Sequence, residues 1–426
     1  MRRSAAAIAT AALVCALGAT PASGARLLTW KTPSRFVTPD QIRLNKPPPG
    51  GPELAPALRV NVLLPDGFTP RRRYPVLYLL HGHGDRYDYW ANPQRGDVRD
   101  VARGFPGIIV MPEGGRGWYT NWWNGGRRGA PTWERYYLDQ LIPLVERRLP
   151  IRAARRWHAI AGLSMGGEGA VFLASQRPGY FGSVASFSGP LSIERPEWPV
   201  GFDTQGEHHQ DVFGDPTAQR FYWIGHNPTA LVGNLRHSRV FVTVGDGVPD
   251  PGFPSEVSNY FGQVAEAELR RHAEDFVAAA RASGVDVTYH PRQGIHDWRY
   301  WRQHLADAID WGFFRPVPRT AASWGYETVA ATGDAWGLRF RFDPPPEGVE
   351  RLSLEDGRIL RGFGFGAVAI RTPSGCRSSI GMRNAWVTRL PRGWRTQPLG
   401  RSQRRRARAE CAALQFGVAV PRRGDR

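Results

Sequence analysis

Ser164 has the surroundings of a residue that does covalent chemistry. It is the centre of Gly162-Leu163-Ser164-Met165-Gly166, and glycines two residues before and after a serine leave room for a strained turn without crowding side chains. The apolar residues 157–161 predict a buried strand, and the small residues 166–176 predict a helix that packs closely on a sheet. This context predicts a nucleophilic serine at a strand-to-helix turn. The alternative is a tight glycine turn with a bystander serine.

A serine hydroxyl becomes a useful nucleophile when a base takes its proton. Among the 11 histidines, His296 follows the last predicted strand in a glycine-bearing loop, so we predict it as the base, with a structural histidine as the alternative. The imidazole in turn needs a carboxylate that orients it. Asp246 and Asp250 follow a predicted strand, and Glu266 begins a predicted helix. The residue pattern alone leaves these three acids open.

The predicted reaction also needs two backbone amides that face the developing negative charge. In a fold of this order, one amide belongs to the residue after the nucleophile, here Met165, and the other to the loop after an early strand, most simply His83. That loop reads His81-Gly82-His83-Gly84-Asp85, and two imidazoles with a carboxylate can also share a metal ion. Metallo-hydrolases of this kind usually have a further histidine where Arg86 stands. We therefore expect acyl chemistry with no metal and no other cofactor.

The elements that must hold these residues alternate between strands and helices. This alternation predicts an α/β fold with a mainly parallel sheet, covered on both faces, whose active site lies at the carboxyl ends of the strands. The order serine, acid, histidine along the chain is that of an α/β-hydrolase. Beyond residue 316, short segments between turn residues predict a small β domain. Strands are expected at 58–64, 75–80, 107–111, 183–187, 240–244 and 285–289, and helices at 133–148, 266–282 and 298–311.

Aromatic residues gather after two predicted strand ends and in the His296 loop. They could line a site for an acyl chain or a sugar, or they could only pack the core. As substrate contacts we predict His81, Trp122, Trp123 and Trp298. The aromatic group consists of Trp118, Tyr119, Trp122, Trp123, Trp133, Trp298, Tyr300 and Trp301.

The start of the chain predicts export. Two arginines, the apolar residues 5–19 and the small residues 21–24 match a secretory leader of residues 1–24, which is too short for a stable membrane span. We expect an extended segment at 25–56, a catalytic domain at 57–316 and a basic β-rich domain at 317–426. Cys376 and Cys411 remain after the leader. In an oxidising compartment they suggest one disulfide, with two buried thiols as the alternative.

The positive charge is concentrated near the end of the chain. Of a formal net charge of +18, most lies from residue 315 onward, where 21 arginines face nine acids. The run 401–408, RSQRRRAR, could bind nucleic acid, but export and the lack of interleaved aromatic residues favour an anionic envelope polymer or simple solvation. We expect a secreted or envelope-associated protein with no nucleic-acid partner.

Seven segments resemble, in this order, the esterase D-like α/β-hydrolases, and within them the mycolyltransferase (antigen 85) branch. The resemblance implies Glu266 as the triad acid, ten residues before Phe276, and it places Asp246 at a position that is not catalytic. Feruloyl-esterase-like relatives have an aspartate just after the strand, which keeps Asp250 open. The resemblance also supports His83 and Met165 as oxyanion donors. The segments lie within residues 58–311 and read LLHGHGDRYDYW, MPEGGRGWYTNWW, WERYYLDQLIP, HAIAGLSMGGEGA, NPTALVGNLR, VGDGVPD and GIHDWRYW.

The chain departs from the mycolyltransferases where they hold trehalose. They carry an aspartate and an arginine in the early loop, where this chain has His81 and Gly84, so its loop is more similar to that of the ordinary esterases. The sequence therefore predicts an exported serine esterase that acts on a small acyl or envelope-linked ester through an acyl-enzyme. Acyl transfer to a sugar is one alternative. A catalytically inactive envelope-binding protein is the alternative outside the enzymes.

Overall fold

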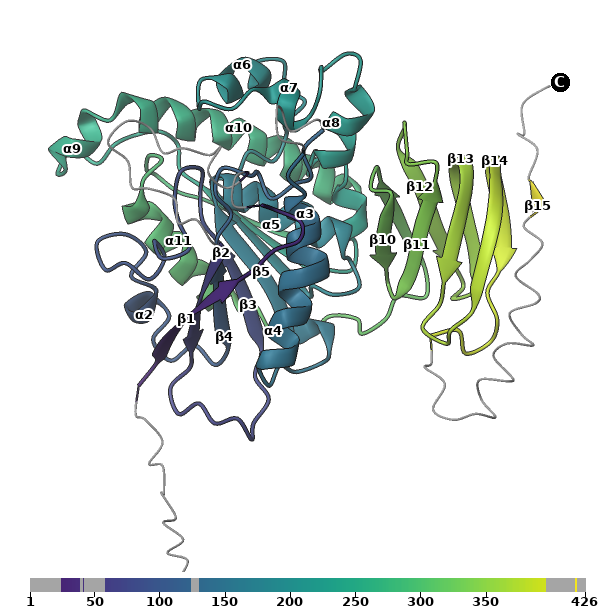
Figure 1. The fold of residues 1–426 in the computed structure, drawn as a ribbon. Helices are drawn as coiled ribbons and strands as arrows, with labels where there is room; N and C mark the ends of the chain where they lie inside the picture. The colour runs from purple at the N-terminus through teal and green to yellow at the C-terminus, as the bar shows by residue number, and fades with distance from the viewer. Residues whose placement is uncertain (1–23, 39–40, 42–57, 124–129, 396–417, 420–426) are drawn as a thin grey trace, which may run out of the picture.

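The computed structural model describes residues 24–38, 41, 58–123, 130–395 and 418–419. It contains two β-sheets, one wrapped by helices and one almost free of them (Figure 1). The helix-wrapped sheet lies in the first three quarters of the chain, and the second sheet follows it. Most of the leader, the arginine run 401–408 and Cys411 lie outside the described residues, so the predictions about them stay predictions.

The first sheet has eight strands in the order β1-β2-β4-β3-β5-β6-β7-β8. The strands from β4 to β8 are parallel, and β1 and β2 join them antiparallel at one edge. The predicted mainly parallel α/β sheet is thereby confirmed. The strands are β1 (Arg26–Thr32), β2 (Leu58–Leu64), β3 (Val76–Leu80), β4 (Ile108–Pro112), β5 (His158–Leu163), β6 (Ser183–Phe187), β7 (Arg239–Val244) and β8 (Asp286–Pro291).

Helices cover both faces of this sheet, because successive strand residues point to opposite sides. In β3, Val76 and Tyr78 join one apolar cluster and Leu77 the other. The first cluster includes side chains of α4, α5 and α10, and the second includes those of α2 and α11. The helices are α2 (Val98–Val101), α3 (Trp133–Arg135), η2 (Tyr136–Leu141), α4 (Ile142–Arg148), η3 (Arg155–Trp157), α5 (Met165–Gln176), α6 (Trp198–Asp203), α7 (His209–Val212), α8 (Arg220–His226), η4 (Val232–Leu235), α9 (Pro254–Val257), α10 (Tyr260–Ala282) and α11 (Trp298–Trp311).

Two expectations about these elements are corrected. The segment expected to be extended surface chain contains strand β1, whose seven residues pair with β2 along its whole length. The helix expected from residue 266 begins six residues earlier, because the side chain of Asn259 accepts a hydrogen bond from the amide of Gly262 and caps the first turn.

The second sheet has seven strands and is antiparallel throughout. Strand β11 shows why it forms: Leu338, Phe340 and Phe342 are buried and the residues between them are exposed. The predicted C-terminal β region is confirmed, and the buried Cys376 belongs to its core. No helix in the described part of the chain is both long and apolar enough to cross a bilayer. The strands are β9 (Trp324–Thr328), β10 (Thr332–Ala335), β11 (Leu338–Asp343), β12 (Glu350–Glu355), β13 (Ile359–Arg371), β14 (Arg377–Arg389) and β15 (Val418–Ala419).

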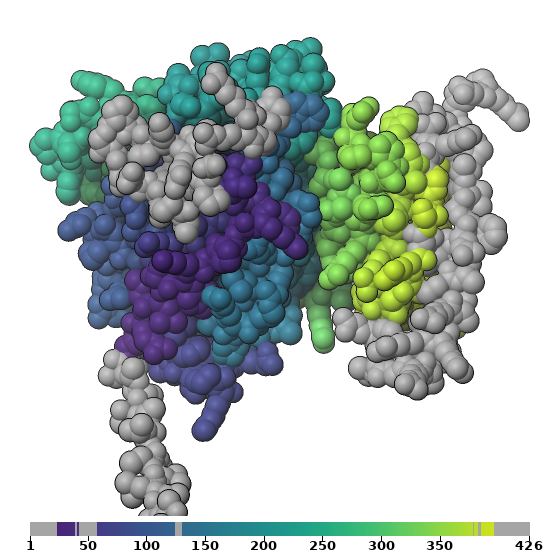
Figure 2. Space-filling model, viewed as in Figure 1, coloured from purple at the N-terminus to yellow at the C-terminus, as the bar shows by residue number. Residues whose placement is uncertain are grey.

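Polar contacts fasten the second sheet to the helices around the first. The hydroxyl of Tyr326 donates to the backbone oxygen of Gln176 (3.2 Å), at the C-terminal end of α5. Asn234 pairs through its amide with both the backbone N–H and the C=O of Glu327 (2.8 Å each). Figure 2 shows the two parts in direct contact.

Candidate active site

Ser164 occupies the turn between β5 and α5 in a backbone conformation that L-residues rarely adopt, with φ of 51° and ψ of −124°. A Cβ on Gly162 would lie 2.2 Å from the backbone oxygen of Gly166, and a Cβ on Gly166 would lie 2.5 Å from that of His81. Both glycines are therefore required by the close approach of β5, α5 and the loop after β3. This packing holds the serine at the carboxyl edge of the sheet.

His296 and Glu266 reach the serine from two other elements. Nε2 of His296, in the loop between β8 and α11, accepts a hydrogen bond from Oγ of Ser164 (2.9 Å). Nδ1 of His296 donates to Oε2 of Glu266 on α10 (2.7 Å). The imidazole side chain is 13% exposed and the carboxylate 0% exposed. The structure thus brings the three predicted residues into one hydrogen-bonded chain whose acidic end is sealed from water.

The second oxygen of Glu266 has its own donors. Oε1 accepts hydrogen bonds from the hydroxyl of Ser188 and the amide of Gly245 (2.6 Å each). Burial raises the pKa of the Glu266 carboxyl, but the hydrogen bonds from His296 and Ser188 outweigh it and hold the pKa below its usual value. The carboxylate therefore stays charged in a dry site, where its hydrogen bond to Nδ1 orients the ring of His296.

Ser188 was not among the predicted site residues. It follows strand β6 at the same edge of the sheet as Ser164, and its hydroxyl also accepts from the indole N–H of Trp301 (3.2 Å). The only sequence signal was its place just after a buried strand, which many serines share.

The other two candidate acids have different partners. Asp246 accepts hydrogen bonds from the amides of Gly294 (3.1 Å) and Val248 (2.9 Å), so it shapes the loop that carries His296. Asp250 forms an ion pair with Arg299 (3.0 Å). Both ring nitrogens of His296 are already engaged, so neither aspartate bonds to it.

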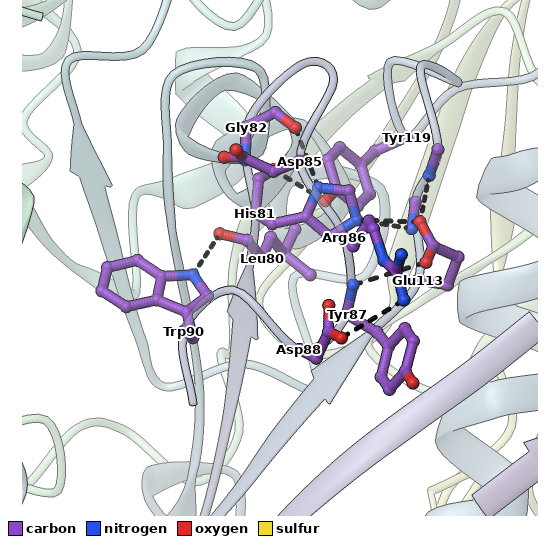
Figure 3. Close-up of polar contacts among 12 residues, drawn as sticks. Leu80, His81, Gly82, Asp85, Arg86, Tyr87, Asp88, Trp90, Glu113 and Tyr119 are labelled. Carbon is purple, nitrogen blue, oxygen red and sulfur yellow. Dashed lines mark hydrogen bonds and ion pairs between the residues drawn. The ribbon is translucent and has the colours of Figure 1, made fainter. Parts of the chain in front are cut away.

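The loop after β3 is rigid, and His81 is the reason (Figure 3). Its ring is buried, Nδ1 donates to the backbone oxygen of Gly82 (2.8 Å), and Nε2 accepts from the amide of Gly114 (2.8 Å). The side chain of Asp85 accepts from the amide of Gly82 (3.1 Å), and the indole of Trp90 donates to the oxygen of Leu80 (2.9 Å). The predicted substrate contact of His81 is therefore wrong, because both ring nitrogens are used inside the protein.

The two residues predicted to supply oxyanion amides lie next to the serine in the chain and in the neighbouring loop. Met165 is the first residue of α5, so its N–H has no carbonyl of the helix to bond with. The loop that carries His83 runs beside the nucleophile, since a Cβ on Gly82 would lie 3.4 Å from the Cβ of Ser164.

The side chain of His83 is hydrogen-bonded to Glu207, between α6 and α7. Glu207 also accepts from Arg116 (3.3 Å), and the His83 ring lies 5.7 Å from that of Trp118. Sequence analysis missed Glu207, because nothing in its local pattern indicates a partner more than a hundred residues away.

The aromatic group divides into core and surface. Trp298 is 9% exposed and packs against Trp90 (5.1 Å between ring centroids), so its predicted substrate contact is wrong. Trp122 is half-buried, and its indole donates to the oxygen of Gly117 (3.1 Å). Trp123 is 40% exposed and free to meet a ligand. Trp118, Tyr119 and Trp133 are fully buried, and Tyr300 and Trp301 nearly so.

The metal alternative finds no support in the geometry. His81 bonds to backbone groups, His83 to Glu207 and Asp85 to the amide of Gly82, so the three do not converge. Within the described ranges, no group of three or more His, Cys, Asp or Glu side chains could hold a metal ion.

Comparisons with known proteins agree with this geometry. The family described as "Putative esterase" matches residues 52–311. An esterase of Mycobacterium tuberculosis is 35% identical over 251 residues, which cover 56% of this chain and 52% of that protein. This chain thus spans about half the length of that relative. The diacylglycerol acyltransferase/mycolyltransferase Ag85A of Mycobacterium leprae is 29% identical over 255 residues, 55% of this chain and 73% of the relative.

Solved structures add a likeness of fold. An S-formylglutathione hydrolase from Agrobacterium tumefaciens matches with a TM-score of 0.52 at 17% identity, over 70% of this chain and 97% of that chain. At this identity the match speaks for the α/β-hydrolase fold alone.

Proposed function

Because this chain belongs to the Esterase family, we propose that it is a serine carboxylic-ester hydrolase that works through an acyl-enzyme. The observation that carries the proposal is the hydrogen-bonded chain from Ser164 through His296 to the buried Glu266. A hydroxyl, an imidazole and a sealed carboxylate in this order can generate an oxygen nucleophile at neutral pH.

In the first half-reaction, Oγ of Ser164 attacks the carbonyl carbon of the ester while Nε2 of His296 takes the hydroxyl proton. The carbonyl electron pair moves to its oxygen, where the amides of Met165 and His83 stabilise the charge. The imidazolium is stabilised by Glu266. His296 then gives its proton to the leaving alcohol as the carbonyl re-forms, and the acyl group stays on Ser164.

In the second half-reaction, water replaces the alcohol. His296 takes a proton from the water, the hydroxide oxygen attacks the acyl carbon, and the collapse of the intermediate returns the proton to Ser164. The products are the free acid and the unmodified enzyme. The two half-reactions consume only the ester and water, and the side chains and backbone amides named above carry every step.

Ser164→Ala tests this assignment. Hydrolysis of p-nitrophenyl butyrate should fall on the order of a thousandfold or more, because only binding and the oxyanion donors remain. Ser258→Ala, on the surface after α9, serves as the control and should keep full activity, as should wild type treated with a chelator. A Ser164→Ala protein that stays active until a chelator is added would refute the serine mechanism. A folded wild-type protein with no turnover of any ester would favour the inactive binding protein.

A second candidate is acyl transfer, which the name of the Mycobacterium leprae relative favours. A sugar acceptor must be held better than water for transfer to win, since orientation is worth several kcal/mol. Because the His81 ring is fully engaged, the exposed Trp123 and the half-buried Trp122 are the predicted contacts left for a sugar, and we expect hydrolysis to dominate. Mass spectrometry of the products formed from a short-chain ester with trehalose or glycerol distinguishes hydrolysis from acyl transfer. Acylated trehalose in excess over free acid would make the protein a transferase.

We place this enzyme outside the cytoplasm, secreted or attached to the envelope, on the strength of the leader-like residues 1–24. We also propose an anionic envelope polymer as a partner of the C-terminal region. In its support, a surface hollow of about 1010 Å³ on β11, β13 and β14 is lined by Arg339, Arg341, Arg371 and Arg377 and by no acid. The division into a catalytic part (57–316) and a β part (317–426) belongs to the same proposal.

A further inference from the structure

Helix α10 has one apolar face that packs on the protein and, at its start, a second apolar face that is uncovered. Leu269 and Phe276 lie on the face that packs on the sheet. On the opposite side, Tyr260 is 73% exposed, Phe261 69% and Val264 71%. These three residues follow the spacing of one helical face but point into solvent. Val257, at the end of the preceding helix α9, is 45% exposed as well. Soluble proteins rarely leave such a contiguous apolar face open without a use for it.

The exposed face is confined to the end of α10 that lies next to the serine. Val264 is two residues before Glu266, and the backbone oxygen of Gly262 accepts the amide hydrogen bond of His296 (3.0 Å). Further along, the solvent side of the same helix carries Arg271 and Glu274. A helix exposed only to water would show charges along its whole outer side, so the apolar start calls for a specific explanation.

The loop before α9 extends the same surface. Val248 is 50% exposed and Phe253 43%. The guanidinium of Arg299 lies 3.5 Å from the centre of the Phe253 ring and pairs with Asp250 and Glu256. This cation is therefore neutralised within the protein and does not interrupt the apolar surface. Six exposed apolar side chains thus lie within residues 248–264, in the segment that leads into the helix of Glu266: Val248, Phe253, Val257, Tyr260, Phe261 and Val264.

We propose that this surface, hereafter the apolar end of α10, docks the enzyme on a lipid surface from which it takes acyl esters. Figure 1 shows α9 and the first turns of α10 at the outer edge of the molecule, so the surface projects outward. A projecting apolar surface suits a broad lipid layer, whereas small ligands are bound in concave sites. The positive net charge, most of it from residue 315 onward, draws the protein as a whole to anionic lipid, and the apolar side chains then enter the headgroup region. The inference rests on the proposed esterase function and names its substrate class: esters presented in a membrane or an emulsion.

The test uses the mature full-length protein and two matched double variants. Phe261→Ser with Val264→Ser removes two side chains of the apolar end of α10. Phe365→Ser with Val200→Ser removes two of nearly equal exposure, 66% and 72%, away from this surface. Co-sedimentation with phosphatidylcholine/phosphatidylglycerol vesicles measures binding to the lipid surface independently of catalysis. Initial rates on emulsified tributyrin and on dissolved p-nitrophenyl butyrate measure how docking affects hydrolysis of an ester in a lipid phase and of an ester in solution.

The first double variant should bind vesicles at least about tenfold more weakly and lose tributyrin hydrolysis to a similar extent, since two of the apolar side chains that would enter the headgroup region are gone. Its rate on the dissolved ester should equal that of wild type, and the control variant should match wild type throughout. Equal vesicle binding by both variants, or none by wild type, overturns the proposal. A wild-type dimer that only the first variant dissociates would assign the surface to a second copy instead. A protein that binds vesicles but hydrolyses neither ester would refute the esterase function and leave docking intact.

Discussion

At Ser164, backbone strain and exposure of the hydroxyl have the same cause. A non-glycine residue with φ of 51° and ψ of −124° costs about 1 to 3 kcal/mol, and the surrounding backbone must hold it there. The Ser164 amide donates to the oxygen of Phe187 (2.8 Å), and its own oxygen accepts from the amides of Gly167 (2.8 Å) and Glu168 (3.1 Å). Both neighbouring elements therefore fix the turn, which leaves Oγ free to bond to His296.

The three residues of the hydrogen-bonded chain differ in how far sequence alone could find them. Ser164 was predictable because its turn demands glycines at fixed positions, and His296 because it follows the last strand. Glu266 was one of three acids until a family resemblance favoured it, since only the packing of α10 decides which carboxylate meets the imidazole. Ser188, which donates to that carboxylate, had no comparable signal.

Glu266→Gln should lower turnover of p-nitrophenyl butyrate on the order of a thousandfold or more. The neutral amide neither holds the His296 tautomer nor stabilises its positive charge. Asp250→Asn is the matched control, because Asp250 is bonded to Arg299 and should matter less than about threefold. The turnover numbers of both variants show which of the two acids orients His296. An active Glu266→Gln enzyme beside an inactive Asp250→Asn enzyme would transfer the role to the aspartate.

At the scale of elements, buried strands and long helices were predictable and the connections were not. An apolar run of five residues between turn residues indicates a strand such as β3, because a strand buried on both faces needs apolar side chains at successive positions. The segment with α6 to α8 has no such periodicity and contains Pro196, Pro199 and Gly201. Its Glu207 reaches the loop after β3 only because the fold brings the two together. The predicted substrate contacts of His81 and Trp298 failed for the same reason. Their residue types suit a ligand, but the fold buries both side chains in the core.

Gly166 lies where the start of α5 packs against the backbone at the end of β3, so Gly166→Ala should disturb the site. The added Cβ would lie 2.5 Å from the oxygen of His81 and 2.8 Å from the carbonyl of Leu80, and both obstacles are backbone. The loop with His83 must move away from Met165, so turnover should fall about a hundredfold with a smaller change in KM, because the amides act mainly in the transition state. Gly233→Ala, where a Cβ meets nothing within 4 Å, is the control. Equal kinetic constants for the two variants would show that this junction does not set the site.

At the scale of the whole molecule, side-chain contacts join the β region to the part of the chain with the helix-wrapped sheet. Arg155 is central to this: its guanidinium donates to the oxygens of His237 (2.7 Å), Pro318 (3.2 Å) and Phe181 (2.6 Å), and it lies 4.7 Å from the ring of Trp336. Burial lowers its pKa to about 10. Within the described part of the chain, backbone carbonyls and no acidic side chain hold this buried cation, so the segment that links the two sheets depends on one side chain.

Arg155→Met should therefore destabilise the protein without harming the chemistry. Met fills much of the same volume but leaves several buried carbonyls without donors, each worth about 1 to 3 kcal/mol, so the free energy of unfolding should fall by about 2 to 5 kcal/mol. Arg155 precedes β5 and Ser164 follows it, so the length of the strand separates them and turnover at 25 °C should stay near that of wild type. Arg156→Met is the matched control, because the neighbouring arginine is exposed and stacks on Trp157. Thermal unfolding followed by tryptophan fluorescence and by residual activity measures both effects. If Arg155→Met and Arg156→Met unfold at the same temperature, the docking of the β region does not depend on Arg155.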